Sequence, residues 1–181
     1  MSMPATAVRI RTLREDDYEP VIAALASWWG NDHVVRMLPR LFFRHFAATS
    51  LAAESGFGGE GDHEYGHEYR AVPAGFLVGI LSSSVPGEAH AHFVGVAPQA
   101  RGQGVGRALY SRFFEIAAER GCTRVTAVTS PANVGSQDFH ARVGFRCVPA
   151  PGTQPSAPQV WKDWDGPGED RVRFERDLAA S

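Results

Sequence analysis

One stretch decides how this chain folds: Val96-Ala97-Pro98-Gln99-Ala100-Arg101-Gly102-Gln103-Gly104-Val105-Gly106-Arg107-Ala108-Leu109. It has the pattern of a strand end, a glycine-rich turn and the first turn of an amphipathic helix. Because its alternate glycines lack Cβ atoms, the backbone N–H groups of the turn can converge on a ligand. The helix N-terminus that follows favours negative charge. The stretch therefore predicts a binding site for an anion of pyrophosphate size.

Two common phosphate-binding loops do not fit this stretch. A P-loop ends in Gly-Lys-Ser/Thr, but the chain's only lysine, Lys162, lies elsewhere. A Rossmann loop that began at Gly102 would need Gly or Ala at position 107, where this chain has Arg107. What remains is the pattern Arg-x-x-Gly-x-Gly, from Arg101 to Gly106.

A second motif lies further along the chain and reads Asn133-Val134-Gly135-Ser136-Gln137-Asp138-Phe139-His140-Ala141-Arg142-Val143-Gly144-Phe145. Helical spacing places Ser136 and His140 one above the other, with Asn133 at the start of the helix. Gly144 suits the position just after a helix, and Phe145 opens the next strand. The motif therefore predicts a short capped helix followed by a strand.

In this order and at this separation, the two motifs resemble the two signatures of the GNAT-type N-acetyltransferase superfamily. The resemblance implies transfer of an acetyl group from acetyl-CoA to an amine by direct attack in a ternary complex. It also implies a single-domain α/β GNAT-like fold, which has a mixed, mostly antiparallel central sheet of about seven strands flanked by about four helices. We expect this N-acetyltransferase domain over residues 7–178.

The resemblance further implies where acetyl-CoA binds as co-substrate. In this family a bulge in the strand before the glycine loop offers backbone N–H groups to the thioester, and Gly95 suits such a bulge. The expected cofactor-binding residues are Val94, Gly95, Val96, Arg101, Gly102, Gln103, Gly104, Val105, Gly106, Arg107, Asn133, Ser136 and Phe139.

The chemistry requires that an amine is deprotonated, an oxyanion is held and a thiolate is protonated. His90 and His92 share one face of an expected strand, and their His-x-His pattern is similar to the proton relay of arylalkylamine N-acetyltransferases. Their ordinary pKa values lie near the working pH. Glu88 and Glu54 are the alternative bases, and the two histidines could instead be solvated strand residues without a role.

His140 stands where the family usually has the tyrosine that protonates the thiolate. An imidazole of ordinary pKa is mostly neutral at pH 7, so His140 would need a water or a raised pKa to act as the acid. Otherwise it would only line the pantetheine tunnel. This departure keeps a non-catalytic CoA-binding or sensing module as an alternative function.

A third motif, His63-Glu64-Tyr65-Gly66-His67, matches the H-E-x-x-H signature of zinc hydrolases. The surrounding glycines each disfavour the required helix by about 1 kcal/mol relative to alanine. No third ligand follows at the usual spacing, and Glu88 is the one candidate left open. We expect a flexible loop over 56–68 and no metal, and keep a zinc hydrolase as the minor alternative.

Composition sets further limits. The 181 residues fit one domain, and the net charge of -2 argues against a nucleic-acid-binding surface. The sequence shows neither a signal peptide nor the ~20 apolar residues that cross a membrane. With Cys122 and Cys147 as the only cysteines, we expect a cytoplasmic protein without disulfides. The abundance of Arg, Ala and Gly indicates a GC-rich bacterium.

The hydrophobic pattern predicts alternating strands and helices. Strands are expected at 7–13, 49–54, 69–84, 88–96, 124–129, 145–148 and 172–178. Helices are expected from Asp16 or Asp17 to about Trp28, from Asn31 or Asp32 with a break at Pro39, over 104–120 and after Asn133. Pro73 requires an edge strand or a bulge, and a proline-rich loop is expected over 149–168.

The acceptor is the part of the reaction that the sequence defines least. Aromatic residues mark the segments that usually wall the acceptor side in this family: Trp28, Trp29, Phe42, Phe43, Phe46, Trp161 and Trp164. They fit an apolar or aromatic amine or an amino-acid side chain, although such rings are more often core. We expect a primary amine of a small molecule or peptide as the partner, and a homodimer is an oligomeric state that the sequence leaves open.

Overall fold

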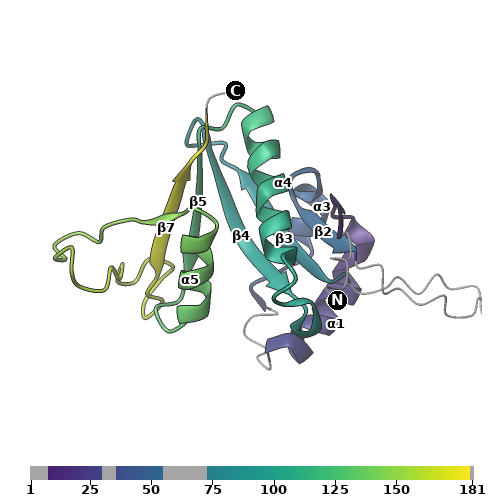
Figure 1. The fold of residues 1–181 in the computed structure, drawn as a ribbon, viewed down its shortest axis with the longest axis horizontal. Helices are drawn as coiled ribbons and strands as arrows, with labels where there is room; N and C mark the ends of the chain where they lie inside the picture. Colours follow the sequence, from purple (N-terminus) through teal and green to yellow (C-terminus); the bar gives the residue numbers. More distant parts are fainter. Residues whose placement is uncertain (1–7, 30–35, 55–72, 180–181) are drawn as a thin grey trace, which may run out of the picture. The chain divides into compact units, whose positions relative to one another are not determined.

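The computed structural model describes residues 8–29, 36–54 and 73–179. Figure 1 shows the arrangement of their helices and strands. The strands are β1 (Arg9–Thr12), β2 (Leu51–Glu54), β3 (Gly75–Leu81), β4 (Glu88–Val96), β5 (Arg124–Thr129), β6 (Arg146–Cys147) and β7 (Val172–Asp177). The α-helices are α1 (Tyr18–Trp29), α3 (Leu41–His45), α4 (Val105–Glu119) and α5 (Val134–Arg142). Short 3-10 helices span Glu15–Asp17, Ala47–Thr49 and Pro98–Ala100.

The strands form one seven-stranded sheet in the order β1-β2-β3-β4-β5-β7-β6. The pairs β1·β2, β2·β3, β5·β7 and β6·β7 are antiparallel, and β4·β5 is parallel. The predicted α/β class with a mixed, mostly antiparallel sheet is therefore confirmed. No described helix has the length and apolar character needed to cross a membrane.

The chain divides into two compact units. Unit 1 comprises residues 1–79 and 93–113, and unit 2 comprises residues 80–92 and 114–181. Strands β3 and β4 and helix α4 therefore contribute residues to both units. The sequence predicted one domain over 7–178 and did not indicate this division.

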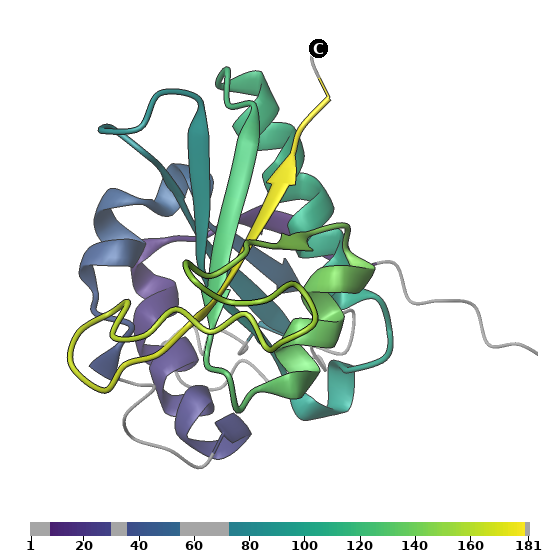
Figure 2. The ribbon, with the colours of Figure 1, turned by 90° about the vertical axis from the view of Figure 1, so that its left-hand side faces the viewer.

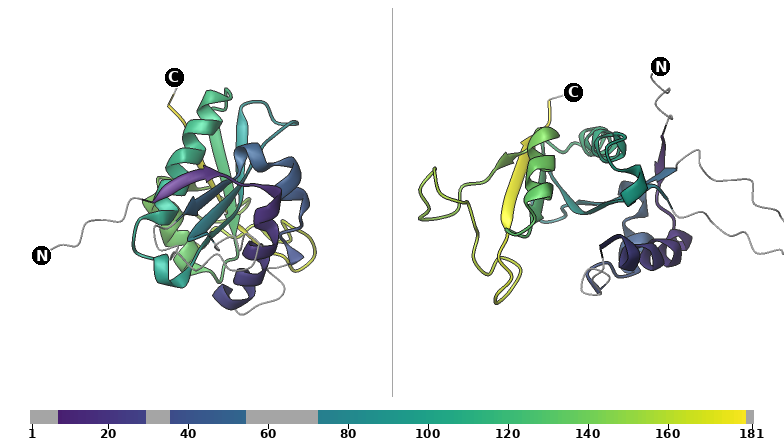
Figure 3. Two further views of the ribbon diagram at one scale, coloured as in Figure 1. Left: turned by 90° about the vertical axis from the view of Figure 1, so that its right-hand side faces the viewer. Right: turned by 60° about the horizontal axis from the view of Figure 1, so that its bottom comes forward.

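Unit 1 has its core between α1, α3 and the strands β2 and β3 (Figure 3, left). The buried residues of this core are Leu13, Val21, Leu25, Leu38, Phe43, Ala52, Phe76 and Val78. Helix α4 covers the opposite face of β3, where a Cβ on Gly79 would lie 2.2 Å from the Phe113 ring. Glycine is thus required there because the helix packs directly on the strand backbone.

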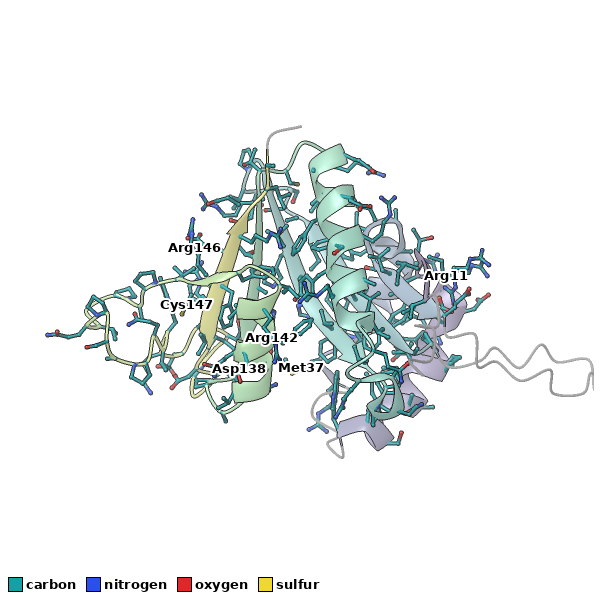
Figure 4. All side chains as sticks on the ribbon, viewed as in Figure 1. Arg11, Met37, Asp138, Arg142, Arg146 and Cys147 are labelled. Atoms are coloured by element: carbon teal, nitrogen blue, oxygen red, sulfur yellow. The ribbon has the colours of Figure 1, made fainter. Side chains whose placement is uncertain are left out.

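The first helix begins differently from the prediction. A 3-10 turn precedes α1, and the Asp17 carboxylate accepts a 2.7 Å hydrogen bond from the backbone N–H of Arg14. The same carboxylate forms an ion pair with Arg11 at 2.7 Å and is 2% exposed (Figure 4 labels Arg11). Asp17 therefore joins the first strand to the helix, since a buried carboxylate needs hydrogen-bonded partners.

Other predicted boundaries hold closely, because they rest on local backbone signals. The break at Pro39 is confirmed, as α3 starts two residues later. Strand β3 begins at Gly75 and lies inside the sheet, so Pro73 precedes the strand and the edge position expected for it is not found. The second helix was expected to start at Asn31 or Asp32, which lie outside the described residues.

Unit 2 places α5 against the buried face of β7 (Figure 2). The His140 ring stacks on Phe174 at 4.9 Å, and Phe114 of α4 packs on Phe145 at 5.7 Å. At the edge strand β6, Arg146 pairs with Glu175 and Asp177 of β7 (Figure 4 labels Arg146). Gly144 has φ +89°, as expected for the residue that ends a helix.

Candidate active site

The predicted anion-binding loop, residues 101–107, lies in unit 1 between β4 and α4. Gly102 and Gly104 have φ values of +75° and +82°, and a Cβ on either would meet nothing within 4 Å. Arg101 Nε donates to the Val96 carbonyl at 3.3 Å, and Gln103 Nε2 donates to the Gln99 carbonyl at 2.8 Å. The open, left-handed turn before a fifteen-residue helix fits a pyrophosphate bound by backbone N–H groups.

Gly95 in β4 is buried for a reason that the sequence did not reveal. A Cβ at this position would lie 2.6 Å from Cε1 of Phe76 and 3.2 Å from Cη2 of Trp29. The ring of Phe93 stacks on Phe76 at 5.9 Å. Close packing of aromatic rings therefore requires glycine here, whereas the bulge expected from the family resemblance stays a prediction.

The two strand histidines lie side by side in unit 2. The rings of His90 and His92 are 6.3 Å apart, as expected for alternate residues of one strand. His90 Nδ1 lies 2.9 Å from Oγ1 of Thr126, and this hydroxyl donates its proton to the Ala89 carbonyl at 3.3 Å. When the hydroxyl proton of Thr126 is used in that bond, Nδ1 of His90 is the donor to Oγ1. The remaining nitrogen, Nε2, then carries a lone pair.

Burial, with smaller contributions from the neighbouring His92 and Arg173, lowers the pKa of His90 to about 4, and Asp165 opposes the shift. His90 is therefore neutral at physiological pH, which differs from the expected pKa near the working pH. A neutral imidazole has a lone pair that can accept a proton, and the lowered pKa makes it a weaker base than an ordinary histidine. Sequence reasoning missed Thr126; its only signal is its place in β5, next to His90 in the parallel pair.

The second motif forms α5 as predicted. The Asn133 side chain accepts a 3.0 Å hydrogen bond from the backbone N–H of Ser136, which caps the helix. Nδ1 of His140 lies 2.7 Å from the Ser136 carbonyl oxygen and 3.3 Å from its hydroxyl. Since a carbonyl only accepts, Nδ1 of His140 is protonated. The Phe139 ring lies 6.0 Å from His140.

His140 is only 6% exposed and sits among aromatic rings. It stacks on Phe174, and its ring centre lies 5.3 Å from that of Phe145 with the two rings nearly perpendicular. Burial lowers its pKa, and the hydrogen bond to the Ser136 carbonyl opposes that shift. The raised pKa that would make His140 a ready proton donor is therefore not found.

The structure also gives the contacts of Glu54, an alternative base, and of the aromatic residues expected on the acceptor side. Glu54 on β2 pairs with Arg11 at 2.6 Å.

Trp29 and Phe43 belong to the core of unit 1. The late tryptophans, Trp161 and Trp164, pack around the guanidinium of Arg173. Of the rings expected on the acceptor side, Phe43 is thus a core residue and the two late tryptophans are partners of a cation. The H-E-x-x-H stretch, residues 63–67, lies outside the described residues.

The comparisons with known proteins agree with this geometry. Residues 18–145 match the acetyltransferase (GNAT) family. A search of curated proteins finds no significant match.

Solved structures share the fold. A Desulfovibrio desulfuricans protein described as a GNAT-family acetyltransferase has a TM-score of 0.69 and 18% identity over 96% of this chain and 100% of its own. The Escherichia coli ribosomal-protein-S18-alanine N-acetyltransferase has a TM-score of 0.64 and 14% identity over 97% of this chain and 96% of its own. Diaminobutyrate acetyltransferase of Paenibacillus lautus, solved with its substrate and coenzyme A, has a TM-score of 0.63 and 19% identity over 96% of each chain.

At these identities the structures show the fold alone, whereas the family match covers most of the chain. Acetyl-CoA is the co-substrate of the matched family, and the glycine loop of unit 1 has the open geometry that its pyrophosphate requires. The chain is therefore a member of the GNAT family of acetyltransferases.

Proposed function

We propose that the chain transfers the acetyl group of acetyl-CoA to a primary amine of a small molecule or peptide, by direct attack in a ternary complex. The observation that carries this proposal is the hydrogen-bonded pair His90–Thr126, which holds a neutral imidazole with its Nε2 lone pair available. No described residue hydrogen-bonds Nε2. An amine acceptor needs such a base because its ammonium form cannot attack a carbonyl.

The residues have separate tasks in this proposal. The loop 101–107 and the N-terminus of α4 bind the pyrophosphate through backbone N–H groups. When bound, acetyl-CoA supplies the thioester carbon that the amine attacks. His90 Nε2 takes the proton that the amine nitrogen loses, directly or through water, and passes it toward His92. Thr126 keeps the His90 ring in the tautomer that this transfer requires.

A second candidate function is a CoA-binding or sensing module without catalysis. Its support is His140, which replaces the usual tyrosine, is buried and has a lowered pKa. A neutral imidazole whose Nδ1 proton is held by the Ser136 carbonyl is a poor acid for the thiolate. An enzyme in which water protonates the thiolate does not need this acid, so the two functions differ in turnover and not in CoA binding.

Thiol release with a panel of primary amines, read alongside mass spectrometry of the products, tests the proposal. Acetyl-CoA binding is measured separately by calorimetry. Acetylated amine and stoichiometric thiol support the enzyme. Tight CoA binding with no thiol release above the uncatalysed rate, for any amine or peptide in the panel, would establish the sensing module instead.

A further inference from the structure

Unit 2 has one polar sheet face. Alternation along the strands and the registers His90↔Thr126, Thr126↔Glu175 and Val128↔Arg173 place the members of this face on three neighbouring strands. They are Glu88, His90, His92, Arg124, Thr126, Val128, Arg173, Glu175 and Asp177. The residues between them, such as Ala89, Val125 and Phe174, are buried on the other face. His90 and Arg173 therefore project from the same side of the sheet.

Arg173 is held in a corner formed by two tryptophans. Its Cζ atom lies 4.2 Å from the ring centre of Trp161 and 3.9 Å from that of Trp164. The two rings meet edge to face, 5.2 Å apart and at 79°. The ring faces attract the positive charge of the guanidinium, but they accept none of its N–H groups as carboxylate oxygens would.

The corner is built before any ligand arrives. The backbone of Trp161 pairs with that of Arg171 through two hydrogen bonds of 2.8 and 3.0 Å, and its indole N–H donates to the Val148 carbonyl at 3.2 Å. Trp164 is 44% exposed, so the corner is open to solvent on one side.

The acidic side chains near this corner have other partners. Arg171 binds Asp165 at 2.6 Å and Glu169 at 2.9 Å, and Lys162 binds Asp170 at 2.6 Å.

Arg173 differs in this respect from its neighbours on the face. Arg124 has carboxylate partners in Glu175 at 3.5 Å and Asp177 at 3.6 Å. Among the described residues, the Arg173 guanidinium makes no ion pair and no hydrogen bond. The N–H donors of this half-buried guanidinium can therefore bind an anion.

Arg173 also acts on the candidate base. Its positive charge contributes to the lowered pKa of His90, so the two groups share one electrostatic environment. Two strand spacings across the sheet and two residues along the strand, together about 12 Å, separate their backbones. A small molecule with an amine at one end and an anion at the other can reach both side chains.

We propose that Arg173 binds a carboxylate of the acceptor, so that the acetylated amine belongs to a small amino acid with a free carboxylate. This rests on the proposed acetyltransferase function. The planar fork of the guanidinium matches the two oxygens of a carboxylate. In the reaction, the amine nitrogen bonds to the acetyl carbon, the carbon–sulfur bond breaks with its electrons on sulfur, the amine proton passes to His90 and the thiolate takes one proton from water. The carboxylate stays unchanged.

Matched acceptor pairs test this inference. Each amino acid in a series from glycine to 4-aminobutyrate and phenylalanine is compared with its own carboxamide by thiol release. The carboxamides have the less basic and more readily deprotonated amines, so chemistry alone favours them. We expect the amino acids to be preferred instead, and Arg173→Met to raise their KM about 10- to 100-fold while leaving the carboxamides nearly unchanged.

Arg124→Gln is the control, because it removes a paired cation from the same face. It should keep the wild-type preference. A wild type that prefers the carboxamides, or an Arg173→Met enzyme that keeps the preference for amino acids, would overturn the inference.

A second measurement does not depend on turnover or on the variant. The indole N–H signals of the wild-type protein are titrated by NMR with the same amino acids and carboxamides, and Trp161→Phe and Trp164→Phe assign two of them. Shifts of these two signals with the amino acids alone support the carboxylate site. Equal shifts with both series, or no shift with either, contradict it. Absence of thiol release with every acceptor would defeat the proposed function and leave this binding result standing.

Discussion

His90 Nδ1 and Oγ1 of Thr126, a residue thirty-six positions further along the chain, form a 2.9 Å hydrogen bond. The bond fixes which nitrogen of the imidazole is free to accept a proton. It also explains how a histidine on a strand can be held in one orientation without a carboxylate partner.

Loss of the Thr126 hydroxyl should therefore reduce turnover. Thr126→Val keeps the shape of the side chain but removes the acceptor for Nδ1. We expect kcat to fall about 3- to 10-fold, as for the loss of one oriented hydrogen bond, with acetyl-CoA affinity unchanged. Thr126→Ser keeps the oxygen and serves as the control. Full turnover in Thr126→Val would show that the tautomer of His90 does not matter.

Removal of both strand histidines should have a larger effect. His90→Ala together with His92→Ala should lower kcat by about 10²-fold, the range for a lost general base, while either single variant is partly rescued by its neighbour or by water. Steady-state rates from pH 6 to 9 give the measurement. If the double variant turns over like the wild type across this range, Glu88 or Glu54 becomes the base.

The free energy of unfolding should decrease at acidic pH because of His90. The pKa of this imidazole falls from its ordinary value of 6.5 to about 4 on folding, so the unfolded chain binds the extra proton between these values. The free energy of unfolding therefore decreases as the pH falls from about 6.5 to about 4, by up to about 3 kcal/mol from this residue. His140, whose pKa is also lowered, acts in the same direction.

Urea unfolding at pH 7.5 and pH 5 measures this change. His90→Asn cannot titrate and should show a smaller loss than the wild type. The matched control is His45→Asn, because His45 is exposed on α3. An equal pH dependence in wild type and His90→Asn would contradict the assigned pKa shift.

Substitution of Gly104 shows whether the glycine loop binds the pyrophosphate, provided that the effect of backbone strain is measured separately. Gly104→Val places a side chain where the pyrophosphate approaches and should weaken CoA binding by more than tenfold in calorimetry. Gly121 has φ +79° and is equally open, but follows the C-terminal end of α4. Gly121→Val therefore carries the same conformational strain and should leave CoA affinity unchanged. Equal affinities in the two variants would place the pyrophosphate elsewhere.

Substitutions of His140 distinguish a packing role of its ring from a role as the proton donor. His140→Ala opens a cavity beside Phe174 and should destabilise the protein by about 2–4 kcal/mol, with CoA affinity nearly intact. His140→Phe keeps the ring but cannot move a proton, and His140→Tyr restores an acidic hydroxyl. If His140 protonates the thiolate, turnover falls in the phenylalanine variant and recovers in the tyrosine variant. Wild-type turnover in His140→Phe would show that the ring at this position contributes only to packing.

The sequence by itself determined the parts of the molecule that depend on neighbouring residues. Strands β4 and β5 have the predicted bounds, Asn133 caps α5 and the glycine loop leads into α4, because alternation, capping and positive φ are properties of short backbone segments. The family resemblance follows from these same local motifs. It predicted roles for the loop and for the histidines at 90, 92 and 140, and these roles stay predictions.

Only the tertiary structure decided how the site residues behave. Thr126 reaches His90 through the register of a parallel strand pair, and Arg173 and Asp165 act on its pKa from far along the chain. Trp161 and Trp164, expected on the acceptor side, enclose the guanidinium of Arg173, a contact that the sequence did not indicate. A pKa and an unused donor depend on burial and on charges brought together by folding, and no pattern of adjacent residues encodes either.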